Sequence, residues 1–152
     1  MSEYIKTIRQ KVGHDPVIQC GASVIVINEA GELLLQLRRD NGMWGYHGGS
    51  VELNEKVEDA ATRELFEETG LRAEALELFG VFSGAEMAYT YPNGDVVSNI
   101  DTVFLCRDYS GELKPQENEV SQLSFFPPTE LPENIFSANI PALNEYLKRF
   151  MK

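Results

Sequence analysis

The chain has 152 residues, of which 43% are hydrophobic and 24% charged, as expected for one globular domain built around one core. No stretch approaches about 18 consecutive apolar residues, and the first segment lacks the apolar run of a signal peptide. A membrane span and export are therefore disfavoured, and we expect a cytoplasmic protein. The formal net charge of −11 disfavours a general nucleic-acid-binding surface, because that field repels polyanions.

The two cysteines, Cys20 and Cys106, each stand alone inside an apolar run, without a second cysteine at Cys-x-x-Cys spacing. A single cysteine among apolar residues is typical of a small buried hydrophobe in a reducing compartment. We therefore interpret both as buried packing residues, in preference to a zinc site or a structural disulfide.

The first third of the chain alternates apolar runs with turns. Residues 4–11 fit either a short strand or a helical turn. Residues 20–27 are β-branched and almost wholly apolar, which predicts a central buried strand. The turn at residues 28–31 leads to a second predicted strand, 33–38, and together they predict a hairpin. The glycine- and aromatic-rich residues 40–49 predict a loop that leads into a short strand.

The clearest predicted helix covers residues 56–69. Asn54 is the expected N-cap, acidic side chains fill the first turn, and Gly70 is expected to close the helix. Acidic residues are concentrated between Glu52 and Glu74, with few basic residues among them. Such a segment is either a solvated helix face or a site for hard cations.

The second half of the chain predicts more strands and one more helix. Helical spacing covers residues 140–150, and residues 129–132 break the chain before it. The predicted strands cover residues 76–83, 88–91, 97–107 and 123–126, with a strong turn at residues 92–95. Strands joined by short turns predict a mixed or antiparallel sheet covered by helices, which is an α/β or α+β domain spanning residues 1–152.

On a helical wheel of residues 56–69, three glutamates gather beside the apolar stripe. Glu68 falls inside the stripe, Glu64 lies at its edge and Glu67 just beyond, so their carboxylates converge on one patch. Like charges at these spacings destabilise a helix, and a carboxylate entering a core costs more unless it is paired. Arg63 is the basic residue available inside the helix. The wheel alone leaves two interpretations open, a tolerated acidic face and a divalent-cation site.

The residues around these glutamates resemble the Nudix box. That signature requires a glycine, five residues, a glutamate, seven residues, and then Arg-Glu-apolar-any-Glu-Glu-any-Gly-apolar. His47 stands where many family members have proline, and Asn54 stands where glycine is common, but neither change removes a carboxylate. Every fixed position of the signature is matched: Gly49, Glu55, Arg63, Glu64, Leu65, Glu67, Glu68, Gly70 and Leu71.

The resemblance implies an α/β/α sandwich with a mixed sheet, in which the box forms a loop–helix–loop motif. It also implies one or more Mg²⁺ ions, with Mn²⁺ as a substitute, held by Glu64, Glu67 and Glu68. Arg63 is expected to pair with Glu55 or Glu67 and so to orient the box glutamates.

Two box features concern the backbone. Gly48 and Gly49 are expected to let the main chain approach its neighbours closely, where a side chain leaves no room. Gly70 is expected to end the helix. We therefore count Gly48 and Gly49 among the substrate-binding residues, and Glu55 and Gly70 as structural parts of the motif.

The activity implied is metal-dependent hydrolysis of a diphosphate bond in a small nucleotide-like molecule. Metal ions neutralise phosphate oxygens and lower the pKa of a water, and a general base takes its proton. The base is either a box glutamate, Glu67 or Glu68, or a carboxylate from a later loop. Glu119, just ahead of a predicted strand, is our candidate from that loop.

Aromatic and basic side chains outside the box are candidate substrate contacts. Trp44 and Tyr46 flank a glycine immediately before the box and are the favoured base-stacking residues, although such residues are more often packing residues. Arg38 can reach a phosphate or pair with a neighbouring acid. Further aromatic candidates are Phe82, Tyr89 and Tyr91.

The leading interpretation is hydrolysis of a nucleoside diphosphate linked to another group, such as ADP-ribose or a nucleotide sugar. A nucleoside triphosphate pyrophosphatase that removes damaged nucleotides shares the box, which does not separate the two. A non-catalytic nucleotide-binding module typically loses box carboxylates, and this chain keeps them. An RNA-cap hydrolase would need a basic surface, which the net charge of −11 argues against. Family members often dimerise, so a homodimer is also an expectation.

Overall fold

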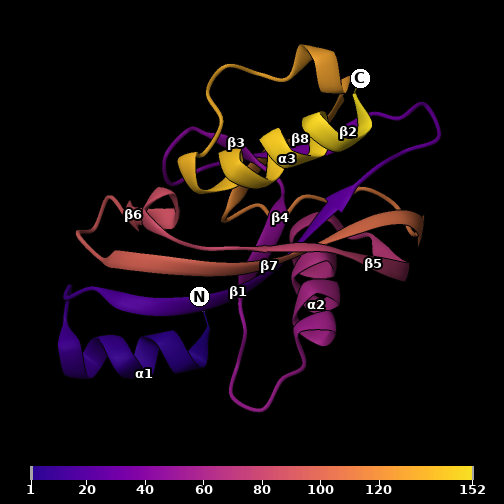
Figure 1. Cartoon of the computed structure of the whole chain (residues 1–152). Helices are drawn as coiled ribbons and strands as arrows, with labels where there is room; N and C mark the ends of the chain where they lie inside the picture. Colours follow the sequence, from indigo (N-terminus) through magenta and orange to yellow (C-terminus); the bar gives the residue numbers. More distant parts are fainter. Residues whose placement is uncertain (1, 152) are drawn as a thin grey trace.

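The computed structural model describes residues 2–151, so residues 1 and 152 of the predicted domain lie outside the described residues. Figure 1 shows strands in the middle of the molecule with helices on both sides. The elements in chain order are α1 (Glu3–Val12), β1 (Val17–Val26), β2 (Leu33–Arg38), β3 (Trp44–Gly45), β4 (His47–Ser50), α2 (Val57–Thr69), β5 (Arg72–Phe82), the 3₁₀ turn η1 (Ala85–Met87), β6 (Ala88–Thr90), β7 (Val96–Ser110), β8 (Val120–Phe126), the 3₁₀ turns η2 (Pro128–Glu130) and η3 (Ser137–Asn139), and α3 (Ile140–Phe150).

Strand β1 lies inside the larger sheet, as its apolar run predicts. It pairs in parallel with β7 along its whole length, and antiparallel with β4, where Ala22 lies opposite Gly49. The strand order of this sheet is β4-β1-β7-β5, with β6 also paired to β7, and a smaller sheet has the order β3-β2-β8. The parallel and antiparallel pairings together confirm the predicted mixed sheet.

The predicted hairpin between β1 and β2 is wrong. The turn forms, because the Gly31 N–H donates to the Asn28 carbonyl at 2.9 Å, and one antiparallel bridge joins Ile27 to Leu33. Beyond this bridge the strands separate, since β1 enters the larger sheet and β2 pairs with β3 and β8. Both strands are apolar on their two faces, and such a pattern shows burial without showing which strand is the partner.

Successive side chains of β1 fill two different cores, because they point to opposite faces of the sheet. Val24 packs in a cluster with Leu65 of α2, whereas Ile25 packs in a cluster with Leu143 of α3. In Figure 1, α2 accordingly lies below the larger sheet and α3 lies above it. The α/β/α layering that the resemblance implies is confirmed.

The N-terminal segment, for which strand and helix were both open, forms the helix α1. Its first turn is capped by the Ser2 hydroxyl, which accepts the Ile5 N–H at 3.0 Å. The carboxylate of Glu52, in the loop before α2, accepts the N–H groups of Glu3 and Tyr4 at 2.9 and 3.2 Å. These donors lower the pKa of Glu52, and the positive end of the helix dipole favours its charge. The helix α1 is thereby attached to the loop that leads into α2.

Helix α2 begins one residue later than predicted and ends at the predicted residue. The prediction of Asn54 as the N-cap is wrong: it adopts a left-handed φ of 65°, and Lys56 occupies the N-cap position without a side-chain hydrogen bond. Asparagine favours both caps and left-handed turns, so its presence did not distinguish the two. Gly70 closes the helix as predicted, with φ 81° and its N–H bonded to the Phe66 carbonyl at 2.9 Å.

The two cysteines are both free, but only Cys106 is buried. The prediction of a buried Cys20 is wrong, because the first half of β1 alternates half-buried and exposed side chains and Cys20 is one of the exposed ones. No helix within residues 2–151 is long and apolar enough to cross a membrane. The cytoplasmic location and the homodimer stay predictions.

We expect Gly70→Ala to lower the free energy of unfolding by about 2 kcal/mol, since the left-handed conformation is costly for a residue with a Cβ atom. The added Cβ would also lie 2.6 Å from the Glu112 carbonyl oxygen. Gly31→Ala is the matched control, because Gly31 has φ 80° but no atom within 4 Å of an added Cβ. Urea unfolding of the two variants measures the difference. Equal losses would contradict a role for the close backbone contact.

Candidate active site

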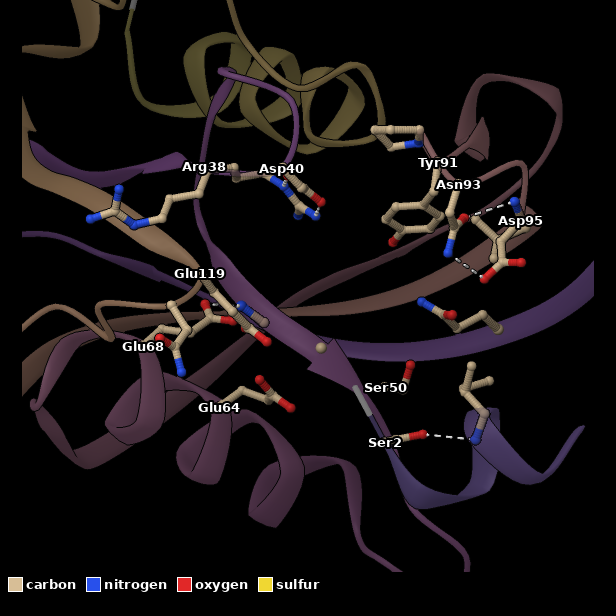
Figure 2. Close-up of a pocket in the computed structure, with 18 of the residues that line it drawn as sticks. Ser2, Arg38, Asp40, Ser50, Glu64, Glu68, Tyr91, Asn93, Asp95 and Glu119 are labelled. Atoms are coloured by element: carbon tan, nitrogen blue, oxygen red, sulfur yellow. Dashed lines mark hydrogen bonds and ion pairs between the residues drawn. The ribbon is translucent and has the colours of Figure 1, made fainter. Parts of the chain in front are cut away.

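A cavity of about 530 Å³ opens between α1, α2 and the turn that joins β6 to β7. Figure 2 shows its two ends. Glu64, Glu68 and Glu119 lie at one end, and Tyr91 and Asn93 lie at the other. The cavity therefore has an acidic end beside α2 and a polar end beside α1.

The three glutamates of α2 differ in burial, in the order that the wheel predicts. Glu68 is 5% exposed, the Glu64 side chain is 15% exposed, and the Glu67 side chain is 46% exposed. Glu64 and Glu68 line the cavity, whereas Glu67 does not and lies 3.6 Å from Arg63. The structure thus brings two of the three predicted metal ligands into the cavity, and the third lies outside its lining.

Arg63 holds the box together through its guanidinium. It donates to both carboxylate oxygens of Glu55, at 2.9 and 3.0 Å, and to Glu64 at 2.9 Å. It also donates to the Ser50 carbonyl at 3.2 Å. The predicted pairing with Glu55 or Glu67 is seen with both, and Glu64 is an additional partner that the sequence did not indicate. Because the Arg63 guanidinium binds both carboxylate oxygens of Glu55, it fixes how the Glu55 and Arg63 side chains are oriented.

Gly48 and Gly49 line the cavity, and each lies close to neighbouring atoms. A Cβ on Gly49 would lie 2.5 Å from the Glu64 carboxylate, and a Cβ on Gly48 would lie 2.7 Å from the Ala22 carbonyl oxygen. The Gly48 N–H donates to the Glu68 carboxylate at 3.1 Å. Glycine is therefore required at both positions for β4 to pack this closely against α2 and β1.

The carboxylates at the acidic end outnumber the basic side chains that could neutralise them. Burial raises the pKa of Glu68 well above its ordinary value, and the neighbouring Glu64 raises it further. Burial also raises the pKa of Glu64, although Arg63 acts in the opposite direction. Within residues 2–151, no three His, Cys, Asp or Glu side chains stand close enough together to hold a metal ion as a ready-made set. The donors present at this end are oxygens, which suits a hard cation such as Mg²⁺.

Arg38 and Glu119 reach the same end of the cavity from the opposite side. The Arg38 guanidinium is held by two hydrogen bonds to Asp40, at 3.0 and 2.7 Å, and lies 4.6 Å from the ring centre of Phe136. Glu119 lies close enough to raise the pKa of Glu68 through its charge. Both predicted residues are therefore near the box glutamates, and their roles stay predictions.

The two favoured aromatic residues take different positions. Trp44 lines neither described cavity, and its ring packs edge-on against Phe126 with centres 5.0 Å apart. Tyr46 is buried and borders a second, smaller cavity of about 70 Å³, which shares Gly48 and Gly49 with the first. Tyr91, one of the further aromatic candidates, lines both cavities.

Two buried polar groups beside the site were missed by the sequence reasoning. Asp101 of β7 accepts hydrogen bonds from Ser23 at 2.7 Å and from the Tyr46 hydroxyl at 2.9 Å, and burial raises its pKa. His47 is fully buried, bonds to Gln36 at 2.7 Å, and has its pKa lowered to about 3 by burial. An acid within an apolar strand is the signal that marks Asp101, whereas nothing in the sequence marked the partner of His47.

The comparisons with known proteins show the family and the fold of this chain. Residues 18–146 match the family model described as the NUDIX domain. The structure of a MutT NUDIX hydrolase from Burkholderia pseudomallei is 28% identical, with a TM-score of 0.72, over 84% of this chain and 97% of that one. This structural likeness supports the layered fold.

Three curated relatives carry different names. A MutT-like protein from Streptomyces ambofaciens is 32% identical over 83% of this chain and 75% of its own length. An ADP-ribose pyrophosphatase from Methanocaldococcus jannaschii is 35% identical over 73% of this chain and 63% of its own length. An NAD-capped RNA hydrolase from Mannheimia succiniciproducens is 32% identical over 78% of this chain, which spans 44% of that protein. The last two names describe a pyrophosphatase and a hydrolase, and they give different substrates.

We expect Arg63→Lys to weaken Mn²⁺ binding about 10- to 100-fold, because lysine cannot hold Glu55 and Glu64 together with a rigid fork. Electron paramagnetic resonance of free Mn²⁺ measures the affinity without relying on turnover. Arg72→Lys is the control, since Arg72 stacks on Phe66 at 4.4 Å and does not line the cavity. Unchanged Mn²⁺ affinity in Arg63→Lys would show that Arg63 does not orient metal ligands.

Proposed function

We propose that this chain, which belongs to the NUDIX domain family, hydrolyses a diphosphate bond. The bond lies in a nucleoside diphosphate that is linked to another group. ADP-ribose and nucleotide sugars are substrates of this class. The proposal rests on one observation above all. Glu64 and Glu68 present two carboxylates to a cavity of about 530 Å³ that Gly48 and Gly49 also line.

The cation in this proposal is Mg²⁺, with Mn²⁺ as a substitute. Glu64 and Glu68 would hold it from the cavity wall, and Glu67 would join them by exchanging its 3.6 Å contact with Arg63. The fit is supported by the oxygen-only donors and by the burial of the two carboxylates, which raises the pKa of Glu64 and of Glu68. When bound, the cation supplies positive charge to the phosphate oxygens and lowers the pKa of a water.

The protein's own groups complete the reaction. Glu119, beside Glu68 in the cavity, would accept the proton of the attacking water. Arg38, held in place by Asp40, would contact a phosphate oxygen of the substrate. Arg63 lies behind the glutamates and acts by keeping their carboxylates in position. In this scheme the water oxygen forms a new bond to phosphorus, the P–O bond of the diphosphate breaks, and the proton of the water passes to Glu119.

The charge of the cavity favours a diphosphate over a triphosphate. Its acidic side chains outnumber the basic ones, and each of Arg9 and Arg38 is paired with an aspartate. A nucleoside diphosphate with a neutral second group brings less negative charge into this field than a triphosphate does. Triphosphate hydrolysis is the alternative within the family. The retained box carboxylates argue against a non-catalytic module.

We expect the protein with Mg²⁺ to release nucleoside monophosphate from ADP-ribose or a nucleotide sugar faster than from a nucleoside triphosphate. Glu68→Gln should lower turnover at saturating Mg²⁺ about 100-fold or more, since it removes a charged ligand of the catalytic ion. Glu58→Gln is the control on the exposed first turn of the same helix. Monophosphate release measured by chromatography tests both parts. No turnover of any compound would reject the enzyme, and an unaffected Glu68→Gln rate would reject the metal site.

Glu119→Gln should lower kcat about 100- to 10,000-fold while leaving KM close to that of the unaltered protein, because a general base acts on the chemical step. Glu117→Gln, two residues earlier in the same loop, is the control. Steady-state rates distinguish a base from a residue that only shapes the loop, since the loss of a loop contact would raise KM as well as lower kcat. Near-normal turnover of Glu119→Gln would return the role of base to a box glutamate.

A further inference from the structure

The helix α1 is a fixed wall of the cavity, although the family match begins only at residue 18, beyond its end. Glu52 holds its first turn, and Ile5 on its inner face is 5% exposed. Near its other end, Arg9 donates to the carbonyls of Gly13, Asp15 and Val96 at 3.0, 2.6 and 2.7 Å. Helix α1 is thus attached at both ends, and Ser2, Ile5 and Arg9 line the cavity together with the glutamates.

The end of the cavity beside α1 is polar and balanced in charge. Arg9 Nε lies 3.6 Å from Asp95, and both side chains are nearly buried. The opposite charges compensate each other, so this end offers no excess positive charge to a phosphate. The other lining groups there include the amides of Gln19 and Asn93 and the ring of Tyr91. Figure 2 shows Tyr91 and Asn93 on the side of the cavity opposite Glu64 and Glu68.

One donor at this end lacks a hydrogen-bond acceptor within residues 2–151. The Nε of Arg9 is buried and makes no hydrogen bond there, although the other guanidinium nitrogens of Arg9 are satisfied by carbonyl oxygens. This Nε is itself buried and lies 3.6 Å from the Asp95 carboxylate, so the polar groups that this end presents to a ligand are those of Gln19, Tyr91 and Asn93. Because the local charge is balanced, a neutral oxygen such as a hydroxyl or a ring oxygen fits better than an anion.

We infer that the α1 end of the cavity, formed by Arg9, Gln19 and Tyr91, is a subsite for a neutral, hydroxyl-bearing sugar ring of the substrate. This inference rests on the proposed function, since the diphosphate must then occupy the end lined by Glu64 and Glu68. The ring comes from one of two sources, the nucleoside or the group linked to the diphosphate. The helix α1 makes the protein selective for substrates that carry such a ring at the correct distance from the diphosphate.

The test replaces Gln19, because Arg9 also fastens α1 and its removal would disturb the fold. Gln19→Leu keeps the size of the side chain and removes its hydrogen bonds, of which the one to Asn99 is long at 3.4 Å. Gln10→Leu is the matched control, an identical change on the exposed face of α1. Three substrates are compared: ADP-ribose, an ADP methyl ester that lacks the distal ring, and ADP-ribose with a 2′-deoxyadenosine.

Gln19→Leu should raise KM for ADP-ribose about fivefold with kcat nearly unchanged, as expected for the loss of one hydrogen bond that only binds substrate. The effect should shrink for the methyl ester if the distal ring occupies the subsite. The rise in KM should be smaller for the 2′-deoxyadenosine compound if the sugar of the nucleoside occupies the subsite. Equal KM values for Gln19→Leu, Gln10→Leu and the unaltered protein, or the same loss on all three substrates, would overturn the inference.

A binding measurement separates this inference from the proposed activity. Calorimetric titration with an ADP-ribose analogue that carries a methylene bridge in its diphosphate reports affinity without hydrolysis. Weaker binding to Gln19→Leu than to Gln10→Leu supports the subsite even if no substrate is turned over. Identical affinity of the two variants rejects the subsite even if ADP-ribose is hydrolysed.

Discussion

The guanidinium of Arg63 contacts three carboxylates, and the site depends on this excess of negative over positive charge. Arg63 bonds to Glu55 and Glu64 and lies 3.6 Å from Glu67, so its single charge leaves the cavity face of α2 acidic. Glu68, one turn further along and buried, receives a backbone N–H instead of a cation. Arg63 holds Glu55 and Glu64 by hydrogen bonds, and a cation would compensate the negative charge that remains on this face of α2.

A series of hydrogen bonds connects helix α1 to the glutamates of the box. Glu52 accepts two N–H groups from the first turn of α1, and its own N–H donates to Glu55 at 3.0 Å. Glu55 in turn receives the fork of Arg63. The short loop between β4 and α2 therefore has an anchor on each side, and one wall of the cavity is tied to the carboxylates on the other.

The sequence predicts features that depend on neighbours along the chain, and it fails where the partner is distant. The last helix, Ile140–Phe150, and the closing Gly70 follow from periodicity and from glycine chemistry, and both agree with the structure. The prediction of a hairpin failed because an apolar strand reveals its burial but not its pairing partner. The prediction that Cys20 is buried failed because its part of β1 has an uncovered face. The motif located the box glutamates, whereas the wall formed by α1 had no sequence signal, since its contacts join residues about 50 to 90 positions apart.

The long parallel pairing of β1 with β7 has a consequence for how the chain reaches this fold. Gln19 and Asn99, neighbours across that pair, are 80 positions apart, whereas β4 meets β1 after a much shorter stretch of chain. During synthesis the residues of β4 and α2 emerge before those of β7, which pairs with β1 on the side away from β4. Closing so large a loop is entropically slow, so we expect the box to assemble first and the rest of the larger sheet to form around it.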